Sequence, residues 1–166
     1  RADRVAAHAT AARYRNTAWA VSRNRNRLKA AWGSQREAKM SPGKVGVLVE
    51  NDYQDMEVWV PLYRLREEGY EAIVLGPEAG IYKSKHGYPV QAQSVSSARA
   101  DDFRGVVIPG GWAPDRLRQH EPILRLVRDL HEKRRVVACI CHGGWVLASA
   151  GIARGRRLTS YIAIKD

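Results

Sequence analysis

The chain has 166 residues, 45% of them apolar, and a formal net charge of +11. This length suits one globular domain, and no apolar run approaches the roughly 18 residues that a membrane-spanning helix needs. The two cysteines, Cys139 and Cys141, cannot build a disulfide framework and do not form a C-x-x-C pair, so we expect no zinc ribbon and no thioredoxin-type site, and we predict a reducing, cytoplasmic setting.

The first 42 residues form a strongly basic segment. They hold ten of the 28 Lys and Arg residues but only two of the 17 acidic residues. The segment could be a basic arm for polyanions, an organelle transit peptide, or a disordered tail outside the folded domain. We favour the last interpretation, because apolar periodicity is weak before Met40 and regular after it. Nucleic-acid binding by the remaining domain, residues 43–166, is therefore not expected.

Regular alternation of elements begins at residue 44. The stretch 44–50 is β-branched and predicts a buried strand, and a helix follows from Asp55 and ends at Gly69. We expect this helix to bury a stripe made of Met56, Val58, Trp59, Val60, Leu62 and Leu65. A second strand at 71–76 precedes a hairpin at 81–93, whose turn contains Lys85, His86 and Gly87.

The second half continues the same alternation. A third core strand at 105–109 runs into the turn Gly110-Gly111. A helix over 121–135 has Pro122 in its first turn and an inward stripe made of Ile123, Leu126, Val127 and Leu130. A buried strand at 136–140, a helix at 142–151 and an apolar stretch at 159–164 follow. We expect the last stretch to form a further strand, and the domain to lack its C-terminal part.

Strands that alternate with helices predict an α/β fold: a three-layer sandwich with a mostly parallel sheet between helices. In such sheets ligands bind at the carboxyl ends of the strands. Three loops follow predicted strands at that edge, at residues 51–57, 110–115 and 141–144. One site can therefore draw on all three loops.

The stretch "VVACICHGGW", residues 136–145, has the order strand, cysteine, small residues, helix. This order is typical of a nucleophile elbow, a sharp turn that lifts one side chain above the sheet. Cys141 is the candidate nucleophile, since backbone N–H groups at a helix start favour a thiolate and can hold an oxyanion. Cys139 still belongs to the strand, and we expect it to be a small buried hydrophobic residue.

Several stretches together resemble the DJ-1/PfpI family, on the side of its PfpI-type intracellular proteases and deglycases. They include "VGVLVENDYQDMEVWVPLYRLREEGYEAIVLG", "KHGYPV", "VVIPGGWAPDRLR", "VVACICHGGWVLASAGIARGRRLTSY" and the closing "IKD". The resemblance runs from about Lys44 to Asp166. It implies a flavodoxin-like sandwich and assembly into dimers or hexamers.

The resemblance also implies roles for individual residues. Cys141 would be the nucleophile and His142 its base, with Asp115 completing a triad across a subunit interface. Glu57 would lie close to the thiol, and Gly110 and Gly111 would serve the oxyanion.

Gly143 joins the candidates for oxyanion or substrate binding, and Trp112 is a candidate wall of the pocket. Two residues depart from the family pattern: Gln54 stands where a glutamate is common, and Gly144 stands where a proline is common.

These residues predict a cysteine-dependent hydrolase that needs no metal and no cofactor. Peptides and glycated, aldehyde-derived groups both fit as substrates. The alternative is a non-catalytic redox sensor or chaperone that uses the oxidisable Cys141. A class I glutamine amidotransferase is disfavoured, because Trp145 occupies the place of its usual glutamine. His86 is expected to be an ordinary surface residue.

Overall fold

A computed structural model describes residues 42–165 of the protein. The predictions for the basic segment 1–42 lie, apart from Pro42, outside the described residues. The described part contains one six-stranded sheet. Its strands are β1 (Lys44–Leu48), β2 (Glu71–Gly76), β3 (Gly80–Lys83), β4 (Pro89–Ser94), β5 (Phe103–Ile108) and β6 (Val136–Cys139).

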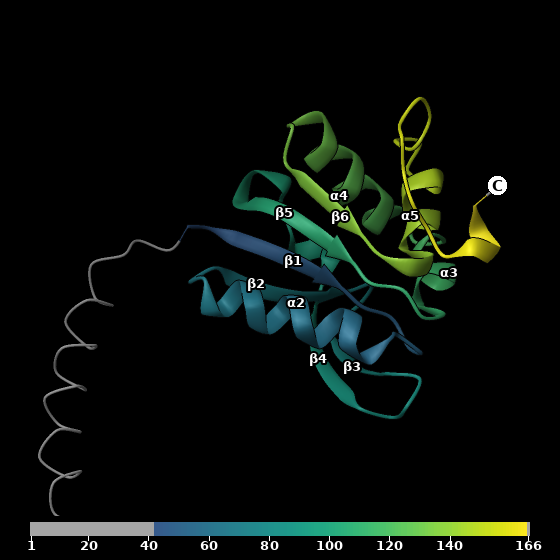
Figure 1. Ribbon diagram of the computed structural model, residues 1–166. Coiled ribbons are helices and arrows are strands. Elements are labelled where there is room, and N and C mark those ends of the chain that lie inside the picture. The colour runs from purple at the N-terminus through teal and green to yellow at the C-terminus, as the bar shows by residue number, and fades with distance from the viewer. Residues whose placement is uncertain (1–41, 166) are drawn as a thin grey trace, which may run out of the picture. The chain divides into compact units, whose positions relative to one another are not determined.

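The strands lie in the order β3-β4-β2-β1-β5-β6 (Figure 1). All neighbouring pairs are parallel except β3 and β4, which form the predicted antiparallel hairpin. The chain runs outward from β1 to β2 in one direction and from β5 to β6 in the other. The strand order therefore reverses between β1 and β5, where parallel sheets open a crevice at their carboxyl ends.

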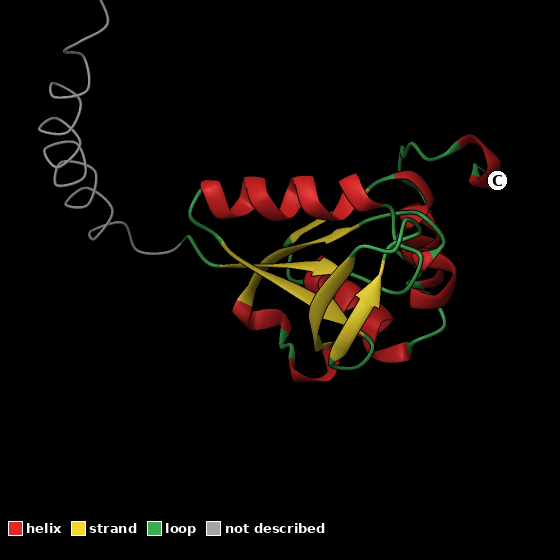
Figure 2. Ribbon diagram, turned by 90° about the horizontal axis from the view of Figure 1, so that it is seen from below, coloured by secondary structure: helices red, strands yellow, loops and turns green. Residues whose placement is uncertain are grey.

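Among residues 42–165, four α-helices accompany the sheet: α2 (Asp55–Glu67), α3 (Ala113–Leu117), α4 (Glu121–Glu132) and α5 (Gly144–Ser149). Figure 2 shows α2 on one side of the sheet and α4 on the other. This arrangement follows from the strand order, because right-handed crossovers that run in opposite directions put their helices on opposite faces. The predicted three-layer, flavodoxin-like α/β sandwich is confirmed.

The hydrophobic core fills both sides of the sheet. The predicted stripe of α4 is confirmed, since it buries Ile123, Leu126, Val127 and Leu130. On the sheet the fully buried side chains include Val47, Leu48, Val106 and Ile108. Burial of these aliphatic side chains holds the strand ends, and the loops that follow them, in fixed positions.

The buried face of α2 differs from the prediction. The helix buries Asp55, Val58 and Leu62, whereas Met56 is 64% exposed and Val60 is 45% exposed. Steps of three and four residues join the three buried positions, so they form the face that packs on β1 and β2. The predicted stripe was too wide, because a helix that covers a sheet from outside buries only one face.

The predicted burial of strand 136–140 was wrong. Val136 is 67% exposed and Ile140 is 50% exposed. Within the described residues β6 is the edge strand of the sheet and pairs with β5. Apolar side chains that point away from α4 therefore remain in contact with solvent.

The predicted strand at 159–164 was also wrong. The segment forms a single 3-10 turn at Ile162–Ile164, and the Tyr161 N–H donates to the carbonyl of Cys141 at 3.2 Å. The segment thus packs beside the strand-to-helix elbow and does not join the sheet. An apolar sequence alone does not provide the neighbouring backbone that a strand requires.

Candidate functional site

The elbow after β6 has the conformation that its sequence predicts. Ile140 is extended, and Cys141 then adopts a left-handed backbone with φ of 58°. A 3-10 turn at Cys141–Gly143 leads directly into α5. A left-handed conformation costs a residue with a Cβ atom about 1 kcal/mol or more. Backbone strain of this kind is often found at functional sites, so the conformation makes Cys141 a candidate.

The half-buried thiol of Cys141 lies next to the imidazole of His142. The distance from Cys141 Sγ to His142 Nδ1 is 3.3 Å. The imidazole is enclosed by aromatic rings: Tyr161 stacks on it at 4.8 Å between centroids, and Trp145 and Trp112 lie at 5.7 and 5.8 Å. These rings restrict the orientations that the imidazole can take beside the thiol.

Sequence reasoning missed two members of this aromatic group, Trp145 and the more distant Tyr161. Tyr161 lies 20 positions after Cys141 along the chain, in a segment that was expected to be a strand. No periodicity marks it as a site residue. Its contact with His142 depends on how the segment folds back on the elbow.

Glu57, Gly110 and Cys141 come together at the carboxyl ends of β1, β5 and β6. The Gly110 N–H donates to Glu57 Oε2 at 2.7 Å. A Cβ atom at Gly110 would lie 2.6 Å from Cys141 Cβ, 2.7 Å from Glu57 Oε2 and 3.0 Å from the His142 nitrogen. Only glycine fits between these groups, so the close approach of three loops depends on the missing side chain.

Gly111 and Gly143 are both constrained by backbone contacts. Gly111 has φ of 75°, and a Cβ atom there would lie 2.5 Å from the Asp52 carbonyl oxygen. A Cβ atom at Gly143 would lie 2.5 Å from the Ile108 carbonyl oxygen, and the Gly143 N–H donates to the Ile140 carbonyl. The amides of Gly110 and Gly143 are therefore already engaged within the protein.

Asp115 and Trp112 lie on the loop and short helix after β5. Asp115 belongs to α3 and is half buried. No hydrogen bond or ion pair joins its carboxylate to another residue within 42–165. The Trp112 ring contacts His142 yet remains 58% exposed. A single chain thus brings Cys141, His142 and Glu57 together and leaves Asp115 unconnected to them.

The second thiol, Cys139, differs from Cys141 in its surroundings. Burial raises the pKa of Cys139 above its usual value. Cys139 is half buried, although full burial was expected. It lines a cleft of about 720 Å³ together with Trp145 and the segment 158–165. Because burial disfavours its thiolate, Cys139 is poorly suited to act as a nucleophile.

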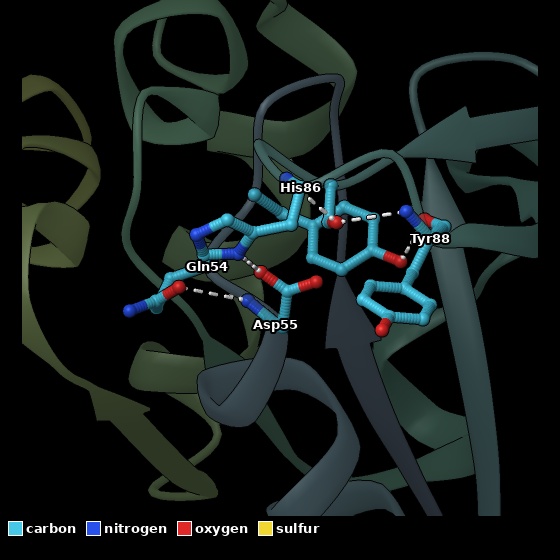
Figure 3. A network of polar contacts seen from close by, with 6 residues as sticks. Gln54, Asp55, His86 and Tyr88 are labelled. Atoms are coloured by element: carbon cyan, nitrogen blue, oxygen red, sulfur yellow. Dashed lines mark hydrogen bonds and ion pairs between the residues drawn. The ribbon is translucent and has the colours of Figure 1, made fainter.

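A polar network joins the start of α2 to the hairpin turn (Figure 3). His86 Nδ1 lies 2.5 Å from Asp55 Oδ2, and the Asp55 N–H donates to the side-chain oxygen of Gln54 at 3.0 Å. His86 is exposed, as predicted for a surface residue, but it has a specific partner. Gln54, the departure from the family pattern, therefore serves as the N-cap of α2.

Asp55 makes a pH-dependent contribution to the stability of the folded state. Burial alone would raise the pKa of Asp55, but the nearby polar side chains of Ser84 and His86 outweigh it and lower the pKa below its usual value. A carboxylate whose pKa is lowered by folding stabilises the folded state at pH values above its pKa in the unfolded chain. This stabilisation is lost as the pH falls through the pKa of the folded state. We expect Asp55→Asn to reduce the free energy of unfolding by about 1 kcal/mol near neutral pH, and by less in acid.

Urea unfolding at a series of pH values checks this prediction. Asp102→Asn is the matched control, because Asp102 is exposed. The prediction is contradicted if the difference between Asp55→Asn and the parent chain stays constant into the acidic range.

Two further observations concern metal binding and membrane-spanning helices in the described part of the chain. Among residues 42–165, no group of three or more His, Cys, Asp or Glu side chains could hold a metal ion. None of the helices in this part of the chain is long and apolar enough to cross a membrane.

The described chain is a doubly wound α/β sandwich with a cysteine and a histidine at a strand-to-helix elbow. Comparison with known proteins defines it further: the chain belongs to the DJ-1/PfpI family, whose sequence model matches residues 43–166. Among its relatives, the deglycase PfpI of Pyrococcus furiosus is 40% identical over 74% of this chain and 75% of its own length. The cysteine protease candidate YraA of Bacillus subtilis is 33% identical over 74% of this chain and 73% of its own.

Solved structures support the same assignment. The chain superposes with a TM-score of 0.72 on a two-domain protein from Anabaena variabilis with DJ-1/ThiJ/PfpI-like and ferritin-like domains, at 38% identity. This match covers 74% of the present chain and 36% of that protein. Oxidized DJ-1 of Toxoplasma gondii gives a TM-score of 0.68 at 25% identity, over 73% of this chain and 68% of its own. The chain thus spans about three quarters of the length of its curated relatives.

Proposed function

We propose that the protein is a cysteine-dependent hydrolase in which Cys141 is the nucleophile and His142 moves the proton. The observation that carries this proposal is the elbow itself. Cys141 is held at a positive φ, with its sulfur 3.3 Å from an imidazole nitrogen. A nucleophile within reach of a base is the arrangement that nucleophilic catalysis requires, and here both residues follow the carboxyl end of a strand in a doubly wound sheet.

In this mechanism the thiolate attacks the carbonyl carbon of the substrate, and the carbonyl electron pair moves to oxygen. Two engaged amides, those of Gly110 and Gly143, are poor candidates to stabilise this oxyanion. We therefore assign the oxyanion to the N–H groups of Gly111 and His142. His142, which has taken the proton of the thiol, then passes it to the leaving group. Water attacks the remaining adduct and releases the product from the sulfur.

For substrates we propose peptides or glycated groups derived from small aldehydes. Relatives at 40% and 33% identity are named as a deglycase and a cysteine protease candidate, respectively. In both reactions the first step is attack by the same sulfur on an electrophilic carbon of the substrate. The exposed indole of Trp112 would form one wall of the substrate pocket.

We propose a homo-oligomer, a dimer or hexamer, as the active form. Within the described chain the Asp115 carboxylate has no bond to His142, while Trp112 beside it is exposed. A second copy would bring its Asp115 to the His142 of the first. We place the reaction in the cytoplasm, because both cysteines are free thiols.

The alternative function is redox sensing, or a chaperone role that uses the same thiol. It is favoured by the carboxylate of Glu57 beside Gly110 and Cys141, since a carboxyl group there could hydrogen-bond an oxidised sulfur. One solved relative is the oxidized form of DJ-1 from Toxoplasma gondii.

One set of assays separates these functions. The chain is tested for methylglyoxal consumption, for release of amines from glycated peptides, and for cleavage of a fluorogenic peptide. A parallel titration with peroxide, followed by mass spectrometry, records the oxidation state of Cys141. Turnover in any of the three assays supports the hydrolase. Oxidation to a stable sulfinate with no turnover supports the sensor.

A further inference from the structure

The first turn of α2 is held from two sides by two of its own carboxylates. Asp55 pairs with His86 at 2.5 Å, and Glu57 accepts the Gly110 N–H at 2.7 Å. Residues two positions apart on a helix point about 200° away from each other. One carboxylate therefore connects the helix to the hairpin turn, and the other connects it to the glycine turn beside Cys141.

The hairpin turn that carries His86 is itself rigidly bonded (Figure 3). The Ser84 hydroxyl oxygen accepts the N–H groups of His86 at 3.1 Å and Tyr88 at 3.0 Å. The Tyr53 hydroxyl donates to the Tyr88 carbonyl at 2.7 Å, and the Lys85 N–H donates to the Tyr53 carbonyl at 3.1 Å. The imidazole thus extends from a fixed support toward Asp55.

The Asp55 carboxylate does not cap its own helix, because the side chain of Gln54 accepts the first N–H group. The Asp55 side chain is only 13% exposed, whereas that of His86 is 60% exposed. A shielded carboxylate that lost its partner would turn toward water and would displace the helix start. Glu57 is only two residues away, so such a displacement would reach the carboxylate beside Cys141.

We propose that His86 and Asp55 are positioning residues that hold the first turn of α2, so that the Glu57 carboxylate stays beside Cys141. Neither side chain needs to touch the substrate, since both act through Glu57. The proposal rests on the proposed function in one respect: a change in Glu57 matters to turnover only if Cys141 is the reacting group.

A double-mutant cycle tests the proposal in the full chain. We expect His86→Ala to lower kcat/KM about tenfold in the parent chain and to have no further effect in a Glu57→Gln background. The second measurement is the rate of Cys141 alkylation by iodoacetamide across a pH series, resolved by site with mass spectrometry. Its pH midpoint in His86→Ala should move toward that of Glu57→Gln.

Two matched variants serve as controls. His86→Asn retains an N–H donor near the position of Nδ1 and should restore most of the lost rate. Lys85→Ala changes an exposed neighbour in the same turn and should behave like the parent chain. If His86→Ala does not fold, Asp55→Asn removes the same ion pair with little change in size and enters the cycle in its place.

Additive losses of kcat/KM, or an alkylation midpoint that His86→Ala leaves unchanged, would overturn the proposal and indicate a contribution to stability alone. The alkylation measurement needs no turnover. A chain that lacks hydrolase activity but shows coupled alkylation midpoints would therefore refute the proposed function and still support the positioning role.

Discussion

Replacing Cys141 with alanine should lower kcat/KM by about three orders of magnitude or more, whichever substrate proves to be turned over. The reason is geometric as well as chemical. The left-handed elbow presents one sulfur beside His142, and the described site contains no other thiol in that position. Loss of the nucleophile removes the covalent step, and bound water does not reproduce it.

The matched control is Cys139→Ala, two positions earlier on β6. It removes the same side chain from a position where burial raises the thiol pKa, so we expect activity to remain within a few-fold of the parent chain. Steady-state assays on both variants, with circular dichroism as a check of folding, provide the measurement. Activity that survives in Cys141→Ala would remove Cys141 from the mechanism, and activity that disappears in a folded Cys139→Ala would show that the second thiol is also required.

Replacing Gly111 with alanine should destabilise the fold by about 3–5 kcal/mol. Two costs add at this position. The backbone has φ of 75°, and the new Cβ atom would lie 2.5 to 2.8 Å from main-chain atoms of Asp52, Tyr53 and Gln54. Main-chain atoms bonded into the surrounding loops cannot move away cheaply, so the loop that carries Glu57 would shift as well.

Gly87→Ala separates the two costs. Gly87 also has a positive φ, of 88°, but nothing lies within 4 Å of a Cβ atom there. Gly87→Ala should therefore lower the free energy of unfolding only by the conformational cost, about 1 kcal/mol. Urea unfolding of both variants measures the difference. Equal losses at the two positions would mean that the crowding at Gly111 is relieved by movements that the structure does not indicate.

The two predictions depend on the same feature of the fold. The turn Gly110-Gly111 joins the β5 loop to the β1 loop: Gly111 packs on the backbone of Asp52 and Gln54, and Cys141 lies against Gly110. Because three loops from three strands meet without intervening side chains, a substitution in one loop should disturb the chemistry of another. We therefore expect Gly111→Ala to reduce activity even under conditions where the variant remains folded.

Sequence patterns predicted the features that depend on neighbours along the chain. The alternation of strands and helices, the hairpin around Gly87, the buried stripe of α4 and the elbow at Cys141 all extend over a few residues or a few turns. Hydrophobic period and turn-forming residues encode such features directly. The resemblance to the DJ-1/PfpI family added Glu57 and Asp115 as site candidates, which no local pattern indicates.

Only the tertiary structure decided which distant groups meet. Asp55 pairs with His86 across 31 positions, and Glu57 bonds to Gly110 across 53. Tyr161 stacks on His142, and the apolar strand β6 lies at the sheet edge. These contacts follow from the order of the strands, and that order is set by burial of the whole core. A local sequence pattern carries no information about it, because strands of the same composition could pair in several orders.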